Sequence, residues 1–423
     1  MSADGASRRG FLQNAGVLAA VAGSSLSPVL PAEARTRGSA AAAPRLEPFY
    51  GTQQAGILTP AQQHTYFAAF DLESGKRDDL VAMLRNWTDA SAAITKGDPA
   101  PMPANDAYGP GESTETTGLA PSRLTLTFGF GAGLFMKDGK DRYGLASARP
   151  DALIDLPRFP GDQLVEARTG GDISVQACAD DPQVAFHAVR HLAQLAYGTA
   201  KIRWGQTGFL AHSKAGETPR NLMGFKDGTG NPSPRDETAM AQFVFVGDDG
   251  PAWMRGGSYV VARRILIALE HWDRMKVDFQ EQTMGRHRAS GAPLGRANEF
   301  DAIDLASTDK DGNPVMPLNA HVRLATAASN DGAKVFRRPY SYNDGVSFTA
   351  ERWPPWRQGM EYDAGLFFIC YQRDPREGFV KIFSKLAKLD MLNQFSTHTG
   401  GGLFACPGGI SPGEFVGEKL LSA

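Results

Sequence analysis

Cysteine is scarce in this chain, which has three among its 423 residues: Cys178, Cys370 and Cys406. The number is odd, the positions are far apart, and no Cys-x-x-Cys spacing occurs. Disulfide frameworks and zinc knuckles need closely matched cysteines, so the sequence argues against both. Cys370 lies in the apolar run 366–371 and is predicted to be a small buried side chain rather than a nucleophile.

A strong charge of one sign is also missing, because 44 basic residues stand against 46 acidic ones, for a formal net charge of -2. No whole-chain electrostatic argument therefore favours binding to nucleic acid or to an anionic membrane. After the first 43 residues no apolar run is long enough to cross a bilayer, so we expect a soluble protein and not an integral membrane protein.

The N-terminal 43 residues have the features of a removed export signal. Arg8 and Arg9 precede an apolar stretch over 15–30, and Ala32-Glu33-Ala34 gives the small-x-small pattern of a cleavage site. The segment resembles a twin-arginine signal and predicts export to the periplasm or the medium by the twin-arginine machinery. The alternative is a disordered Ala/Ser-rich tail with a chance arginine pair.

The remaining chain alternates between strand-like and helix-like patterns. Predicted strands are 63–71, 125–130, 242–247, 257–264 and 365–371; predicted helices are 78–87, one starting at 180–182, 266–275 and 379–389. Residues 95–121 are rich in Pro, Gly, Ser and Thr and indicate a long surface insertion. A polar Gly/Pro region at 211–234 divides the rest into two α+β halves, 44–232 and 233–423.

The stretch 224–232 is the most informative part of the sequence. It places one carboxylate, Asp227, in a glycine-rich turn with Gly228 and Gly230, which both tolerate positive φ. Asn231-Pro232 biases the following backbone to extended or turn geometry. A rigid loop that lets a ligand approach the backbone is one interpretation, and a plain surface turn is the other.

A second candidate group lies in the C-terminal half. His321 stands in a short alternating segment, and the pair Arg337-Arg338 follows sixteen residues later. A neutral imidazole is a good axial ligand for haem iron, and a guanidinium keeps its charge in a buried pocket. Taken singly, a lone histidine is more often structural and an arginine pair more often solvated.

Together these segments resemble dye-decolourising (DyP-type) haem peroxidases. Residues 225–232 are similar to the family's GxxDG signature, and 285–288 with 290–294, 319–325, 336–342 and 365–372 resemble its later blocks in the same order. With the leader, the likeness is to the exported subgroup that includes deferrochelatase/peroxidase proteins. The resemblance implies haem b held between two ferredoxin-like α+β domains.

The resemblance also implies roles for individual residues. His321 would be the proximal iron ligand, with Asp227 and Arg337 on the opposite face as proton shuttle and fixed cation. The first arginine of the pair, rather than Arg338, would face the haem. Further implied contacts are the backbone of Gly228, Thr229 and Gly230 at the haem edge, Arg323 at a propionate, Thr326 beside the haem, and Asp363, with Glu361 as the alternative, accepting the second N–H of the histidine.

The expected function is therefore an exported haem b peroxidase that reduces hydrogen peroxide and oxidises dyes, phenols or other small or aromatic donors. The alternative is a deferrochelatase or haem-handling protein that releases iron and leaves the porphyrin intact. A fold that has lost haem and acts as a binding module is a third possibility. A homo-oligomer is possible on either enzymatic interpretation.

Overall fold

Nine strands form one antiparallel sheet that closes on itself. The computed structural model describes residues 45–100, 115, 118–213, 217–350 and 358–422, and residues 44–423 make up one compact unit. The strands run in the order β5-β9-β2-β3-β1-β4-β7-β8-β6, and β5 also pairs with β8, which closes the sheet into a barrel. Their bounds are β1 His64–Leu72, β2 Thr125–Phe130, β3 Ile173–Ala179, β4 Ala200–Phe209, β5 Ser258–Ile267, β6 Phe336–Arg337, β7 Tyr340–Ala350, β8 Gln358–Gln372 and β9 Ser396–Cys406.

The two predicted halves contribute contiguous parts of this sheet. Strands β2, β3, β1 and β4 come from the first half, and β9, β5, β8, β7 and β6 come from the second. The two parts meet at two seams with one paired position each, Phe130 with Ala405 and Phe209 with Ser341. The division between residues 232 and 233 stays a prediction.

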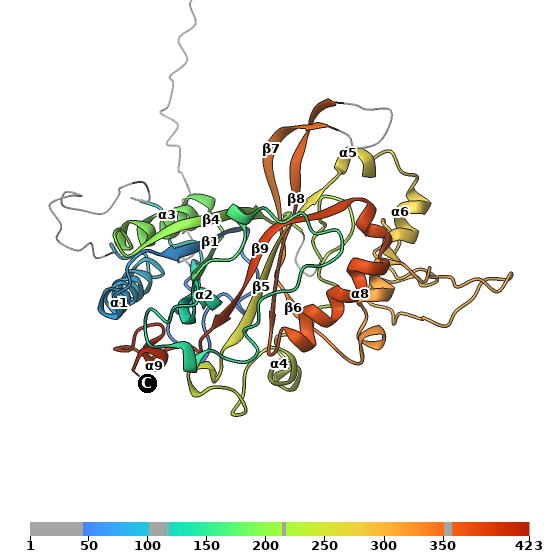
Figure 1. Cartoon of the computed structure of the whole chain (residues 1–423). Helices are drawn as coiled ribbons and strands as arrows, with labels where there is room; N and C mark the ends of the chain where they lie inside the picture. Colours follow the sequence, from blue (N-terminus) through green and yellow to red (C-terminus); the bar gives the residue numbers. More distant parts are fainter. Residues whose placement is uncertain (1–44, 101–114, 116–117, 214–216, 351–357, 423) are drawn as a thin grey trace, which may run out of the picture. The chain divides into compact units, whose positions relative to one another are not determined.

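Helices cover the sheet and connect its strands (Figure 1). Their bounds are α1 Arg77–Ile94, α2 Ala132–Phe135, α3 Pro182–Leu195, α4 Glu237–Phe243, α5 Leu269–Trp272, α6 Val277–Met284, α7 His321–Ala325, α8 Lys381–Leu389 and α9 Glu418–Leu421. Helix α3 begins where Asp181 accepts hydrogen bonds from two first-turn amides and Pro182 supplies a preset φ. It packs on β1 and β3 and against α1, where Trp87 is fully buried and donates to the Leu192 carbonyl at 2.7 Å.

Several predicted elements are confirmed. Residues 63–71 and 125–130 form β1 and β2, 257–264 lie in β5, and 365–371 lie in β8. The helix at 78–87 is part of α1. Residues 379–389 are also helical: the first two end a π-helical turn, Arg376–Val380, and the others form α8. Most of the predicted insertion at 95–121 lies outside the described residues.

Two predicted elements are wrong. Residues 242–247 are not a strand but the end of α4 and the turn after it. The apolar Val244, which contributed to the strand-like pattern, is buried in the core. Residues 266–275 are not one helix, because β5 continues to Ile267 and only the short α5 follows. Strands β3, β4, β7 and β9 were not predicted.

Two other expectations concern side chains and membranes. All three cysteines are buried and free, which confirms that they form no disulfide framework. Across the described part of the chain, no helix combines the length and apolar character that a bilayer crossing needs.

Candidate functional site

The glycine-rich loop is held against its own preceding segment. The amide of Asp227 donates to the Pro219 carbonyl at 2.9 Å, and Arg220 pairs with Lys226 as an isolated antiparallel bridge. Gly228 has φ of 126°, so it adopts the positive φ that the sequence predicted, whereas Gly230 does not. A Cβ at Gly230 would meet nothing within 4 Å, so this side of the loop is open.

Asp227 and Arg337, 110 residues apart in the sequence, form an ion pair. Nη1 of Arg337 lies 3.0 Å from Oδ1 of Asp227, and 27% and 16% of the two side chains are exposed, respectively. Asn231 fixes the strand β6 to the loop, because its side chain donates to the Arg337 carbonyl at 2.8 Å and accepts from the Arg337 amide at 2.7 Å. The carboxylate and the guanidinium are thus held by the same short loop.

The neighbouring arginine has a different role. Arg338 is buried and donates to the Thr59 carbonyl and to the side chain of Gln62. Successive side chains of a strand point to opposite sides, so only Arg337 meets the loop carboxylate. The choice of Arg337 over Arg338 agrees with this geometry.

His321 is the first residue of α7 and is oriented by a carboxylate. Its Nδ1 lies 2.6 Å from Oδ2 of Asp390, whose side chain is only 3% exposed. Oδ1 of Asp390 accepts from the Leu392 amide at 2.8 Å and so begins a 3₁₀ turn, Met391–Gln394. The remaining ring nitrogen, Nε2, has no hydrogen-bond partner among the described residues.

The predicted partner of His321 is therefore wrong. Asp363 does not accept from His321; its carboxylate instead accepts from Nη2 of Arg264 at 2.7 Å, and the same nitrogen donates to Asp344. Sequence reasoning missed Asp390 because the two residues are 69 positions apart and belong to separate segments. The only local signal is an aspartate directly after an amphipathic helix, which by itself predicts a cap.

Burial and the surrounding charges shift the pKa of His321 in opposite directions. Burial lowers the pKa of His321, but the Asp390 carboxylate outweighs this and leaves the pKa raised. Arg337 lowers the same pKa and Asp227 raises it, so both charges lie close enough to act on the imidazole. The His321 side chain keeps 29% of its surface accessible.

A cavity of about 450 Å³ adjoins the ion pair. Its lining includes Asp227, Gly228, Thr229 and Arg337 at one end and exposed Phe300. Its other lining residues are of two kinds. The apolar and aromatic ones are Leu58, Pro60, Ala61, Leu210, Pro219, Pro232, Pro234, Phe336, Pro339, Tyr340 and Leu366, and the polar ones are Thr59, Arg220, Asn221, Asn231, Ser233, Arg338 and Ser341. An apolar cavity with a few convergent polar groups is typical of a small-molecule site.

The other predicted contact residues have partners within the protein. Arg323 donates to the Met316 carbonyl at 3.2 Å, and Thr326 caps the turn Ala327–Asn330 by accepting from the Ser329 amide. Thr229 donates its hydroxyl to Glu299 at 2.9 Å. Their contacts with a cofactor stay predictions, as do those of Gly228 and Gly230.

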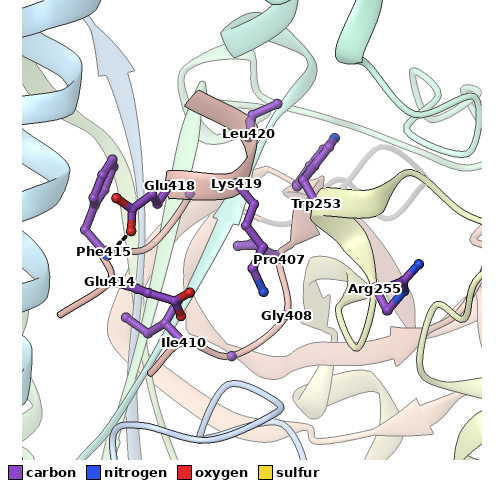
Figure 2. A pocket seen from close by; sticks show the side chains of 12 residues that line it. Trp253, Arg255, Pro407, Gly408, Ile410, Glu414, Phe415, Glu418, Lys419 and Leu420 are labelled. Atoms are coloured by element: carbon purple, nitrogen blue, oxygen red, sulfur yellow. Dashed lines mark hydrogen bonds between the residues drawn. The ribbon is translucent and has the colours of Figure 1, made fainter. Parts of the chain in front are cut away.

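A second cavity, near the C-terminus, is too small for a cofactor. Figure 2 shows it between α9, the segment around Pro407 and Gly408, and the side chain of Trp253. Its volume is about 20 Å³, room for roughly one water molecule. Within the described ranges, no group of three or more His, Cys, Asp or Glu side chains is arranged to hold a metal ion.

Comparison with known protein families identifies the family to which the chain belongs. The model of the Dyp-type peroxidase N-terminal domain matches residues 54–210, and that of the C-terminal domain matches residues 218–411. The chain belongs to the Dyp-type peroxidase family. Both the Asp227–Arg337 pair and His321 fall within the region that matches the family's C-terminal model.

Individual family members are similar over most of their length. A dye-decolorizing peroxidase of Thermobifida fusca is 38% identical, with 99% of this chain and 97% of that protein aligned. A deferrochelatase of Escherichia coli K12 is 37% identical over 89% of this chain and 87% of its own length. Ferric DtpA of Streptomyces lividans is 40% identical, with a TM-score of 0.80 over 90% of this chain and 98% of that structure.

Proposed function

We propose that this protein is a haem b peroxidase that reduces hydrogen peroxide and oxidises aromatic or other small donors. The observation that carries the proposal is the pairing of a carboxylate-oriented imidazole, His321 with Asp390, and a nearby carboxylate–guanidinium pair, Asp227 with Arg337. Membership of the peroxidase family supports the reaction class. The relatives named above support it as well.

The residues present fit a haem. Asp390 accepts from Nδ1 of His321, which favours the N–H at that nitrogen, so the lone pair of Nε2 would be available to bind haem iron. Gly228 and Gly230 offer backbone without side chains beside the Asp227 carboxylate, and the apolar cavity suits a flat hydrophobic ring. When bound, the haem iron would supply the redox centre.

Asp227 and Arg337 then have complementary tasks. Cleavage of the peroxide bond requires a proton to leave one oxygen and reach the other, and in this proposal the Asp227 carboxylate accepts it and returns it. Arg337 stabilises the negative charge that develops as the bond polarises, without exchanging a proton. Because Asn231 holds the backbone of Arg337 to the loop of Asp227, the two groups keep their relative position.

The test is the reaction of purified haem-loaded protein with hydrogen peroxide. Asp227→Ala and Arg337→Ala should each slow the spectral change that follows peroxide by about 100-fold or more, since positioned acid–base groups and charge stabilisers contribute on that scale. Asp248→Ala and Arg255→Ala remove a matched but exposed pair at 2.6 Å and should react at the wild-type rate. Full turnover in both site variants would show that the proposed mechanism is wrong.

A second candidate function is iron release from haem, favoured by the 37% identity to the E. coli deferrochelatase. Both functions use His321 and differ in the product. Chromatography of the tetrapyrrole after incubation with haem and a reductant distinguishes them, because a deferrochelatase yields iron-free porphyrin. Peroxide-driven oxidation of a phenol without free porphyrin supports the peroxidase.

We further propose that the chain is exported by the twin-arginine route and that the mature part consists of two ferredoxin-like halves. Arg8 and Arg9 support the first point. The contiguous strand sets of the barrel, which meet only at two single-position seams, support the second. Replacing both arginines with lysine should leave the protein in the cytoplasm; unchanged export would exclude this route. Association into a homo-oligomer remains part of the hypothesis.

A further inference from the structure

Glu299 contacts the catalytic loop on both sides of Asp227. One carboxylate oxygen forms an ion pair with Nζ of Lys226, directly before Asp227. The other accepts the hydroxyl of Thr229, two residues after it, at 2.9 Å. The backbone of Asp227 and Gly228 therefore lies between two residues, Lys226 and Thr229, whose side chains both bind the Glu299 carboxylate.

Glu299 is itself fixed in place. Its carbonyl accepts from Nη1 of Arg286 at 2.9 Å, and the same nitrogen donates to the Gly291 carbonyl at 2.6 Å. Gly291 approaches so closely that a Cβ there would lie 2.7 Å from Cδ of Lys226. The segment that carries Glu299 thus packs directly on the loop and can hold it rigidly.

The charge on Glu299 is maintained by the residues it holds. Burial alone would raise its pKa, but Lys226 and the hydroxyls of Thr218 and Thr229 outweigh burial and hold the pKa below its ordinary value. The carboxylate, whose side chain is 9% exposed, can therefore accept from both partners at neutral pH. Lys226 balances its charge, so Glu299 adds no net charge beside Asp227.

We propose that Glu299 is a positioning residue for Asp227, and that its clamp on Lys226 and Thr229 sets the angle at which the Asp227 carboxylate meets peroxide. The proposal rests on the proposed function, in which Asp227 moves the proton. Displacement of a reacting group by about 1 Å can cost up to about 100-fold in rate. Glu299 touches neither peroxide nor cofactor in this role and acts only through the loop.

The test compares Glu299→Ala and Glu299→Gln with the wild type, after each has been loaded with haem. The alanine variant should react with hydrogen peroxide about 10- to 100-fold more slowly. The glutamine variant keeps an acceptor for Thr229 but loses the ion pair with Lys226, so its rate should lie between those of the wild type and the alanine variant. Haem content and the rate at which a phenol reduces the oxidised protein should not change. Glu73→Gln removes a remote ion pair at 2.8 Å and is the control.

Amide hydrogen exchange gives a readout that does not depend on activity. Exchange should rise in residues 224–231 of both Glu299 variants and stay unchanged in β1 and β3. The double variant Asp227→Ala/Glu299→Ala should react no more slowly than Asp227→Ala alone, within about twofold, because residues that act through one another are not additive.

Two outcomes would overturn the proposal in distinguishable ways. If Asp227→Ala is impaired but both Glu299 variants react like the wild type, Glu299 has no positioning role and the proposed function stands. If Asp227→Ala itself reacts at the wild-type rate, the proposed role of Asp227 fails, and the positioning role fails with it. If the alanine variant does not fold, the glutamine variant decides.

Discussion

Replacement of Asp390 with asparagine should weaken haem binding although the side chain keeps its size. Asp390 accepts two hydrogen bonds, from Nδ1 of His321 at 2.6 Å and from the Leu392 amide at 2.8 Å. An asparagine has only one oxygen for these two donors. If that oxygen stays on Leu392, the amide NH₂ faces Nδ1 and favours the tautomer with the proton on Nε2, which cannot bind iron. If the amide turns over, its NH₂ faces the Leu392 amide instead.

Both arrangements have a cost that can be stated. The flipped amide leaves the half-buried Leu392 N–H without its acceptor, which costs at most about 1–3 kcal/mol. The wrong tautomer must be reversed before iron can bind, and loss of such a partner typically lowers metal affinity by about 10- to 100-fold. Asp390→Ala loses both bonds, including the cap of the 3₁₀ turn, and should destabilise the haem-free protein by roughly 2–4 kcal/mol.

The assay is titration of haem-free protein with haem, followed by the rate of haem transfer to an acceptor protein. Thermal or denaturant unfolding of the haem-free variants measures the stability term separately. Asp363→Asn is the matched control, because its carboxylate binds Arg264 and lies away from the imidazole. Wild-type haem affinity and transfer rate in Asp390→Asn would refute the reasoning, as would a weaker affinity in Asp363→Asn than in Asp390→Asn.

Three other perturbations have expected outcomes. Arg337→Ala should lose peroxide reactivity with little change in melting temperature. Arg338→Ala, at a 4% exposed position, should mainly lower the melting temperature. The opposite pattern would contradict the assignment of Arg337, rather than Arg338, to the site. Gly401→Ala should lower the free energy of unfolding by more than about 3 kcal/mol, because φ is 134° and a Cβ would lie 1.9 Å from a β5 carbonyl oxygen. Gly413→Ala, where a Cβ would meet open space, should lower it by about 1 kcal/mol, and chemical denaturation measures both. Burial, together with a neighbouring guanidinium, holds the pKa of His398 well below its ordinary value, so below about pH 6.5 the unfolded chain takes up a proton that the folded protein does not. The free energy of unfolding should therefore decrease as the pH is lowered, by up to about 1.4 kcal/mol per pH unit. His398→Gln should show a smaller decrease, and an equal decrease would exclude His398 as its source.

The sequence was sufficient where function depends on local backbone chemistry. One of the two interpretations of the pattern around Asp227 was a rigid loop, since Gly228 can adopt the positive φ that is observed and the Asn231-Pro232 step restricts the backbone. Asn231 is also the residue that fixes Arg337, although nothing in the sequence indicates a contact across 106 positions. Asp227 and Arg337 were predicted as site residues, but the Asn231–Arg337 contact that holds them together could not be predicted.

Contacts between remote segments account for the failures. Asp363 has the right chemistry for the histidine, but the strand that carries it brings it to Arg264, and the end of α8 brings Asp390 to His321 instead. Apolar residues at 242–247 suggested a strand because a buried helix end and a buried strand have the same composition over six residues. Strand β9 was missed because its centre is a run of glycines, Gly400 to Gly402, which has low strand propensity.

Strand β9 also determines when this protein can complete its fold. Among the described residues it is the last strand along the chain, yet it lies between β5 and β2 in the sheet and pairs with both. Until residues 396–406 have left the ribosome, β2 and β5 each keep an open edge, and open edges invite pairing with other chains. The barrel is therefore completed only after residues 396–406 have been made, and a chain that stops before residue 396 would keep an open sheet.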